Sequence, residues 1–264
     1  MRRTIGHTIY GKGHQKIIVL HDWFGDTNSN YAGMLEFLDV NQFTFAFVDL
    51  RGYGLSKNIP GDCTLDEAVS DIRGLVEFLG WTAFDIISHS MSALIAQRLA
   101  IEFCEQKASN TSQIRRIVAI TPVPACGNPA PESVISFLED AALGNEISAR
   151  QIIQFMTGYQ QPSEFVDKKV KQWFETSIPE ARAAYLKMFS EIDFSERAKG
   201  DLTPFLVIVG SNDAEGYSES VMQQTFMKWY PNAQLSVLQG SGHYPMQEQP
   251  LKLAQIIQRY LGEK

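Results

Sequence analysis

The segment Phe84-Asp85-Ile86-Ile87-Ser88-His89-Ser90-Met91-Ser92 decides the fold, because an apolar run passes here into a helical run through small and polar residues. Residues 84–87 have the apolar composition typical of a buried strand, and residues 93–102 have a helical pattern. A serine on a sharp turn from strand to helix needs small residues two positions before and after it, because the strained backbone approaches neighbouring segments. Ser88 and Ser92 meet this requirement around Ser90, where glycine is usual at both positions. The segment therefore predicts a serine presented at the end of a strand, although a serine in this place can also be a simple helix N-cap.

Several further apolar runs surround this segment, and each is bounded by polar or glycine-bearing residues. They comprise residues 17–20, 43–50, 116–120, 205–209 and 235–238. Continuous apolar strands indicate a sheet that is covered on both faces. Between two of these runs, residues 65–79 place apolar side chains at intervals of three and four, as an amphipathic helix does. The alternation predicts an α/β fold with a mostly parallel central sheet flanked by helices.

The alternation of strands and helices is interrupted once. Between residues 122 and 199 no convincing strand occurs, and helical stretches are predicted at residues 132–143, 148–156, 164–176 and 180–189. Prolines at the start of this region stop a preceding helix and stiffen the chain. We therefore expect residues 1–121 and 200–264 to form one core in two parts, with residues 122–199 inserted as a helical lid.

Composition excludes several classes of protein. The 264 residues carry a net charge of −7 and no basic block, which argues against a nucleic-acid partner. The longest apolar runs fall far short of the roughly 20 residues that span a bilayer, and the N-terminus does not resemble a secretory signal. These features predict a cytoplasmic protein with a small-molecule substrate, and they leave the oligomeric state open.

The three cysteines predict no disulfide framework and no metal site. Cys63, Cys104 and Cys126 are odd in number, lack a C-x-x-C spacing and have no histidine at metal-ligand intervals. We expect reduced, structural thiols that take no part in the chemistry.

Two further residues join Ser90 as candidates for nucleophilic catalysis. His243 follows the last apolar run within Gly240-Ser241-Gly242-His243, and Asp213 follows residues 205–209. The chain order serine, aspartate, histidine, with each residue on the loop after its own strand, suits a nucleophile, an orienting carboxylate and a base. Four other residues near these positions could compete for the role of Asp213; they are Asn212, Glu215, Asp193 and Asp201. A turn-stabilising role is the alternative for His243.

An oxyanion hole is predicted from two backbone N–H groups. The loop His21-Asp22-Trp23 follows the first apolar run, and Trp23 is the candidate for one donor. Met91, directly after Ser90, is the candidate for the other. Donors aimed at the oxygen where negative charge develops stabilise the transition state of acyl transfer.

With these landmarks the sequence resembles the α/β-hydrolase superfamily, in its lidded serine esterase-like branch. The resemblance covers nearly the whole chain and includes Asp-x-Arg-Gly-x-Gly-x-Ser at residues 49–56, the Ser90 segment, and Gly242-His243 followed by Glu248 and Pro250. The first family motif normally reads His-Gly, so Asp22 departs from it. The resemblance implies acyl transfer, in which Ser90 attacks a carbonyl, His243 takes its proton and Asp213 holds the imidazole. No metal or organic cofactor is implied.

The predicted reaction is hydrolysis of a carboxylic ester of small to medium, largely apolar character. Carbon–carbon bond hydrolysis of a diketone-type substrate, and lactone or amide cleavage, remain open because one set of residues serves them all. A weakly catalytic protein that binds a small ligand is the alternative from another class. Four residues are predicted to line the substrate pocket, and they are Asp22, Tyr159, Trp173 and Phe189.

Overall fold

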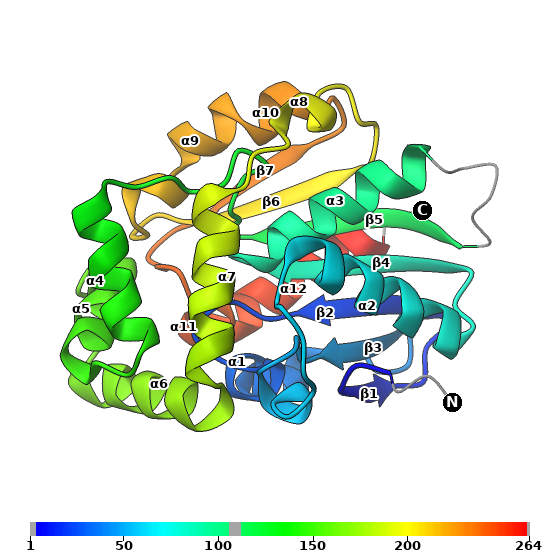
Figure 1. Ribbon diagram of the computed structural model, residues 1–264. Helices are drawn as coiled ribbons and strands as arrows, with labels where there is room; N and C mark the ends of the chain where they lie inside the picture. The colour runs from blue at the N-terminus through cyan, green and yellow to red at the C-terminus, as the bar shows by residue number, and fades with distance from the viewer. Residues whose placement is uncertain (1–3, 106–111, 263–264) are drawn as a thin grey trace.

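The computed structural model describes residues 4–105 and 112–262, which fold around a seven-stranded sheet (Figure 1). The strands lie in the order β1-β3-β2-β4-β5-β6-β7. β1 pairs antiparallel with β3, and the other pairings between these strands are parallel. Their bounds are β1 His7–Gly11, β2 Gln15–Leu20, β3 Phe43–Val48, β4 Ala83–His89, β5 Gln113–Ile120, β6 Phe205–Gly210 and β7 Gln234–Leu238. The predicted α/β fold with a mostly parallel sheet is confirmed.

The central strands are buried on both faces. Every residue of β3 and of β6 is buried, which explains why these segments are continuous apolar runs rather than alternating ones. In Figure 1, α2 and α3 lie in front of the sheet and α12 lies behind it. The helices and 3-10 turns of the core are α1 Thr27–Tyr31, η1 Ala32–Phe37, η2 Gly54–Ser56, α2 Leu65–Leu79, α3 Ser92–Glu105, η3 Glu215–Tyr217, α9 Glu219–Gln224, α10 Phe226–Trp229, α11 Pro245–Glu248 and α12 Pro250–Gly262.

Helix α2 shows why the apolar spacing was informative. Thr64 caps its first turn by accepting a hydrogen bond from the Glu67 N–H, and Gly80 ends it in the left-handed conformation. Its buried side chains recur at intervals of three and four residues, and these face the sheet; they are Leu65, Ala68, Val69, Ile72, Leu75 and Val76.

Between β5 and β6 the chain forms helices only, apart from one isolated bridge between Ser177 and Tyr53. Helices α4 to α7 gather on one side of the sheet, at the carboxyl ends of its parallel strands, and run from green to yellow in Figure 1, whereas α8 lies beside α10. We refer to α4–α7 as the lid helices. The bounds in this region are α4 Glu132–Ala142, α5 Glu146–Met156, α6 Ser163–Thr176, α7 Pro179–Glu191 and α8 Ser195–Ala198.

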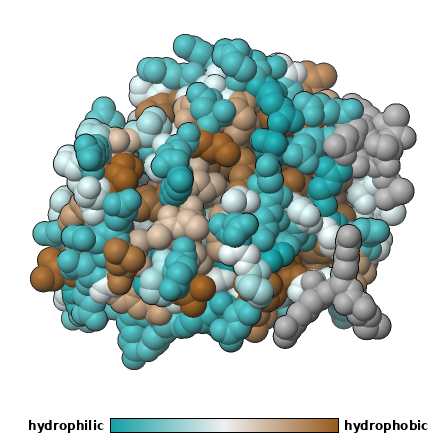
Figure 2. Space-filling view, viewed as in Figure 1, coloured by the Kyte–Doolittle hydropathy of each residue, from teal (hydrophilic) through white to brown (hydrophobic). Residues whose placement is uncertain are grey.

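The surface in Figure 2 is mixed, with hydrophobic residues in small separate areas among hydrophilic ones on this face. Among residues 4–105 and 112–262, each helix is too short or too polar to cross a bilayer.

Candidate active site

Ser90 stands on a tight turn between β4 and α3. Its φ angle of 53° lies in the left-handed region, where a residue with a side chain is strained. Hydrogen bonds hold the turn: the Ser90 N–H donates to the Ile120 carbonyl at 2.9 Å, and the Ser92 hydroxyl accepts from the His89 N–H at 3.0 Å. Ser90 therefore lines a cavity at the end of the sheet while its side chain stays almost fully enclosed.

His243 lines the same cavity from the loop after β7. Its Nδ1 lies 2.8 Å from Oδ2 of Asp213. Because a carboxylate oxygen accepts, Nδ1 carries the hydrogen, which leaves a lone pair on Nε2. A neutral imidazole in this state is able to take a proton from a hydroxyl group in the cavity.

Asp213 follows β6 and uses both of its oxygen atoms. Oδ1 accepts from the Ala214 N–H at 2.7 Å, while Oδ2 faces His243. Burial raises the pKa of the Asp213 carboxyl above its ordinary value, and the pairing with His243 partly offsets this rise.

The carboxylates that compete with Asp213 for the role of orienting His243 make other contacts in the structure. Asp193 accepts from the Ser195 N–H, and Asp201 accepts from the Thr203 N–H, so both serve local turns. Glu215 lies on the cavity wall, but no hydrogen bond between Glu215 and His243 occurs among the described residues.

Trp23 and Met91, the predicted backbone donors, lie on two different loops. Trp23 lines the cavity from the loop after β2, and Met91 directly follows Ser90. No described acceptor takes a hydrogen bond from either backbone N–H, so both donors are free to bind an oxygen atom. The Trp23 loop is fixed in place because the Tyr53 hydroxyl donates to the Trp23 carbonyl at 2.9 Å and the Trp23 indole donates to the Arg182 carbonyl at 2.8 Å.

The cavity has a volume of about 300 Å³ and a mostly apolar wall. The core supplies Trp23, Phe24, Ser90, Asn128, Ala214, Glu215, Gly216, Tyr217 and His243, and the lid helices supply Val134, Phe137, Leu138, Gln151, Ile152, Phe155, Met156 and Phe189. A concave, mostly apolar site with a few converging polar groups is typical of a small-molecule pocket.

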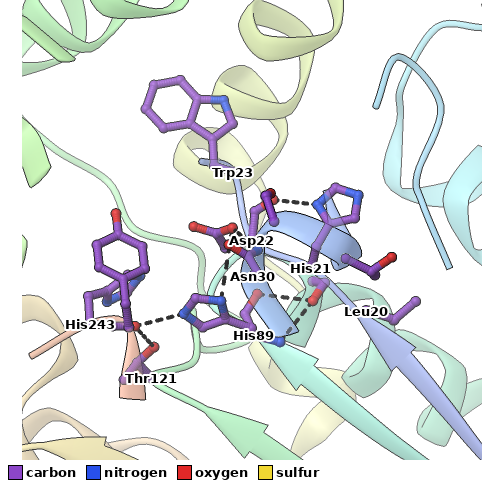
Figure 3. Close-up of polar contacts among 12 residues, drawn as sticks. Leu20, His21, Asp22, Trp23, Asn30, His89, Thr121 and His243 are labelled. Carbon is purple, nitrogen blue, oxygen red and sulfur yellow. Dashed lines mark hydrogen bonds and ion pairs between the residues drawn. The ribbon is translucent and has the colours of Figure 1, made fainter. Parts of the chain in front are cut away.

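Of the four residues predicted for the pocket, the structure places Phe189 on the cavity wall and the other three elsewhere. Tyr159 lies in the turn after α5 with a φ of 59°, and its side chain is largely exposed. Trp173 is fully buried, with its ring 4.2 Å from that of Phe24, and it therefore packs behind the wall. Asp22 is fully buried as well, and Asn30 donates to its Oδ1 at 2.6 Å (Figure 3).

Sequence reasoning missed three polar residues of the cavity, Asn128, Gln151 and Tyr217. The Tyr217 ring meets the His243 ring edge to face at 4.4 Å, and the Asn128 amide donates to the Tyr217 hydroxyl at 3.4 Å. Burial raises the pKa of Tyr217, while hydrogen bonding with Ser90 lowers it. The position of Tyr217, four residues after Asp213, was the available signal for a side chain beside the site.

The charged residues after β3 stabilise the framework of the fold. Asp49 accepts from the N–H and hydroxyl groups of Thr27 and from the Leu55 N–H. Arg51 makes a two-pronged ion pair with Asp71. These bonds hold the loop beside the Trp23 loop.

Comparison with known proteins assigns the family. The family model described as "Alpha/beta hydrolase family" matches residues 17–256. The chain belongs to the alpha/beta hydrolase family. The match runs from within β2, through the helices between β5 and β6, to within α12, and β1 lies outside it.

Individual relatives of this alpha/beta hydrolase are distant. A serine hydrolase-like protein from Danio rerio is 33% identical over 91 residues, which are 33% of this chain and 27% of that protein. The chain thus aligns with little more than a quarter of that relative's length. A hydrolase from Oleispira antarctica has 20% identity and a TM-score of 0.82 over 98% of this chain and 94% of its own. An esterase from Exiguobacterium antarcticum has 16% identity and a TM-score of 0.81 over 97% and 95% of the two chains. At these identities, the solved structures establish the fold.

Proposed function

We propose that this alpha/beta hydrolase cleaves a carboxylic ester of small to medium, largely apolar character through an acyl-enzyme. The observation that carries the proposal is the 2.8 Å contact between His243 Nδ1 and Asp213 Oδ2, beside a cavity that Ser90 also lines. Because Nδ1 faces the carboxylate, Nε2 is left as the proposed base for Ser90, which is held on a strained turn.

The proposed reaction has two steps. In the first, Ser90 Oγ bonds to the ester carbonyl carbon, its proton passes to His243 Nε2, and the oxyanion accepts from the N–H groups of Trp23 and Met91. His243 then gives the proton to the departing alcohol as the carbon–oxygen bond breaks. In the second step, His243 takes a proton from water, hydroxide attacks the acyl carbon, and Ser90 leaves with that proton restored. Asp213 orients the imidazole throughout.

The cavity wall supports the choice of substrate. Aromatic and aliphatic side chains dominate it, and it contains no lysine or arginine. A volume of about 300 Å³ lies at the small end of ligand pockets, which suits a short acyl or alcohol group. The relatives described as serine hydrolase-like and as an esterase are consistent with this choice.

Wild type, Ser90→Ala and the control Ser211→Ala test the proposal with p-nitrophenyl esters of increasing acyl length and with a serine-directed phosphonate. Ser211 lies on an exposed loop position outside the cavity. We expect hydrolysis and labelling in wild type and in Ser211→Ala, and neither in Ser90→Ala.

Other outcomes separate the alternatives. Labelling of Ser90 without hydrolysis of any ester would favour cleavage of a carbon–carbon bond, a lactone or an amide by the same residues. The absence of both labelling and hydrolysis in wild type would overturn the proposal in favour of a small-ligand-binding protein.

A further inference from the structure

A buried lysine of the lid reaches the core beside the cavity. Lys169 lies in the middle of α6, is 1% exposed, and places its Nζ 2.5 Å from Oδ1 of Asn30. The same ammonium group lies 4.2 Å from the centre of the Tyr244 ring. Because α6 supplies no residue to the cavity wall, this lysine is not a substrate contact.

The contacts continue from Lys169 to the loop that carries Trp23. The Asn30 amide, which accepts from Lys169, donates to Asp22 Oδ1 at 2.6 Å. Asp22 directly precedes Trp23, the proposed oxyanion donor. One lid cation is therefore joined through a single amide to a carboxylate at the loop of Trp23. Figure 3 shows the contact between Asn30 and Asp22.

A second branch runs from Asp22 to the loop of His243. The Nδ1 atom of His89 lies 4.0 Å from Asp22 Oδ1, and its Nε2 lies 2.8 Å from the His243 carbonyl oxygen. The Thr121 hydroxyl donates to the same carbonyl at 3.2 Å (Figure 3). Since a carbonyl only accepts, Nε2 of His89 carries the hydrogen, and Nδ1 of the neutral ring is a bare acceptor.

Asp22 and His89 each have one buried side-chain atom without a partner. Within the described residues, Asp22 Oδ2 and His89 Nδ1 are both buried and make no hydrogen bond. The two side chains approach each other with acceptor atoms, Nδ1 of His89 and Oδ1 of Asp22 at 4.0 Å, which leaves a vacant place for a proton between them. The ammonium group of Lys169 makes that proton unnecessary, because it already balances the carboxylate.

The charges that act on the gap between Asp22 and His89 come from several elements of the fold. Burial alone would raise the pKa of Asp22, but the charge of Lys169, followed by His89, Asn30 and His243, lowers it to about 2. Burial lowers the pKa of His89 to about 3, and the nearby charge of Asp22 opposes this fall. Burial also lowers the pKa of Lys169, and the charges of Asp22, Asp26 and Glu248 oppose that change.

We refer to four residues as the buried chain: Lys169, Asn30, Asp22 and His89. We propose that the buried chain positions both the loop of Trp23 and the loop of His243, and that the lid holds the chain in place through the ammonium group of Lys169. The proposal rests on the proposed function, because it assigns positioning residues for that reaction. It also gives a role to the aspartate that departs from the family's His-Gly motif.

The test compares Lys169→Met, the double variant Asp22→Asn/Lys169→Met and wild type. Methionine keeps the length of the side chain and removes its charge, and the double variant has no unpaired buried charge. Lys168→Met is the matched control, because Lys168 neighbours Lys169 in α6 and is exposed. The measurements are kcat and KM for a p-nitrophenyl ester, together with NMR titration of the histidine side chains.

We expect Lys169→Met to lower kcat about tenfold or more while KM changes less than about threefold, since free substrate does not touch the chain. The double variant should recover part of kcat. In Lys169→Met, the vacant place between Asp22 and His89 should take up a proton, so the pKa of His89 should rise by about one unit or more. Lys168→Met should match wild type in each measurement.

Unchanged kcat together with an unchanged His89 titration in folded Lys169→Met would overturn the inference. If Lys169→Met does not fold, the double variant decides: kcat equal to wild type would show that the chain holds neither loop. If wild type cleaves no ester, the proposed function fails, while the His89 titration and the backbone resonances of Trp23 and His243 still test the chain.

Discussion

The carboxylate of Glu248 accepts hydrogen bonds from the backbone on both sides of His243. Its Oε2 accepts from the Gly242 N–H at 2.7 Å, and its Oε1 accepts from the Tyr244 N–H at 2.8 Å. Burial raises the pKa of Glu248, and these two N–H donors oppose the rise by stabilising the ionised form. The side chain therefore fixes the peptide segment from which the proposed base projects.

Glu248→Gln should lower kcat roughly tenfold, equivalent to about 1.4 kcal/mol, with a smaller effect on KM. The amide offers one oxygen where two N–H groups need acceptors, so one side of the His243 loop loses its bond. Steady-state ester hydrolysis measures the effect. Glu175→Gln, at an exposed position on α6, provides a charge-matched control, and equal kinetics for the two variants would contradict the prediction.

Asp213→Asn should lower kcat by about three to four orders of magnitude. The asparagine oxygen is expected to stay with the Ala214 N–H, which turns the amide NH₂ group toward His243 Nδ1. The hydrogen of the imidazole would then move to Nε2, which could no longer take the proton of Ser90. The rate of ester hydrolysis and the rate of phosphonate labelling both measure this loss. A loss below about tenfold would instead point to Glu215, the other carboxylate beside the site.

Stability at mildly acidic pH should depend on His89. Burial lowers its pKa from 6.5 to about 3 in the folded protein, so between these values the unfolded chain binds a proton that the folded protein does not. The free energy of unfolding therefore falls as pH decreases through this range, by at most about 1.4 kcal/mol per pH unit from this group.

His89→Gln should make that decrease shallower, because glutamine does not titrate and its amide can still donate to the His243 carbonyl. Urea unfolding at about pH 6, 5.5 and 5, just below the ordinary histidine pKa, measures the slope for both proteins. The carboxyl groups contribute equally to the slope in both proteins. Parallel slopes would mean that His89 is already charged in the folded state.

Much of the fold could be predicted because its signals are local. The apolar run of β6 and the helical spacing of α2 each report burial on their own. Strand β1 was missed because it lies at the sheet edge, where all five of its residues are partly or largely exposed, so no apolar run marks it. Its pairing with β3 depends on contacts with residues some forty positions away, which no local pattern reports.

The candidate site likewise has a part that the sequence could predict and a part that it could not. Ser90, Asp213 and His243 each follow a predicted strand, and parallel strands bring their carboxyl ends to one edge. The positions of lid side chains could not be predicted, because a helical pattern shows which face is buried but does not show which segment that face packs against. The inward face of α6 turns Lys169 and Trp173 toward the loop of Trp23 rather than into the cavity.

Ile152→Ala should shift the preferred p-nitrophenyl ester toward a longer acyl chain. Ile152 of α5 lines the cavity, so removing its outer carbon atoms enlarges a space of about 300 Å³. The variant should also lose about 2 to 4 kcal/mol of stability, because a buried side chain is truncated. Ile153→Ala is the matched control, since Ile153 is buried on the same helix but does not line the cavity. The control should lose similar stability and keep the wild-type preference, and a preference that changes equally in both variants would show that general loosening of the lid, not cavity volume, sets the chain length.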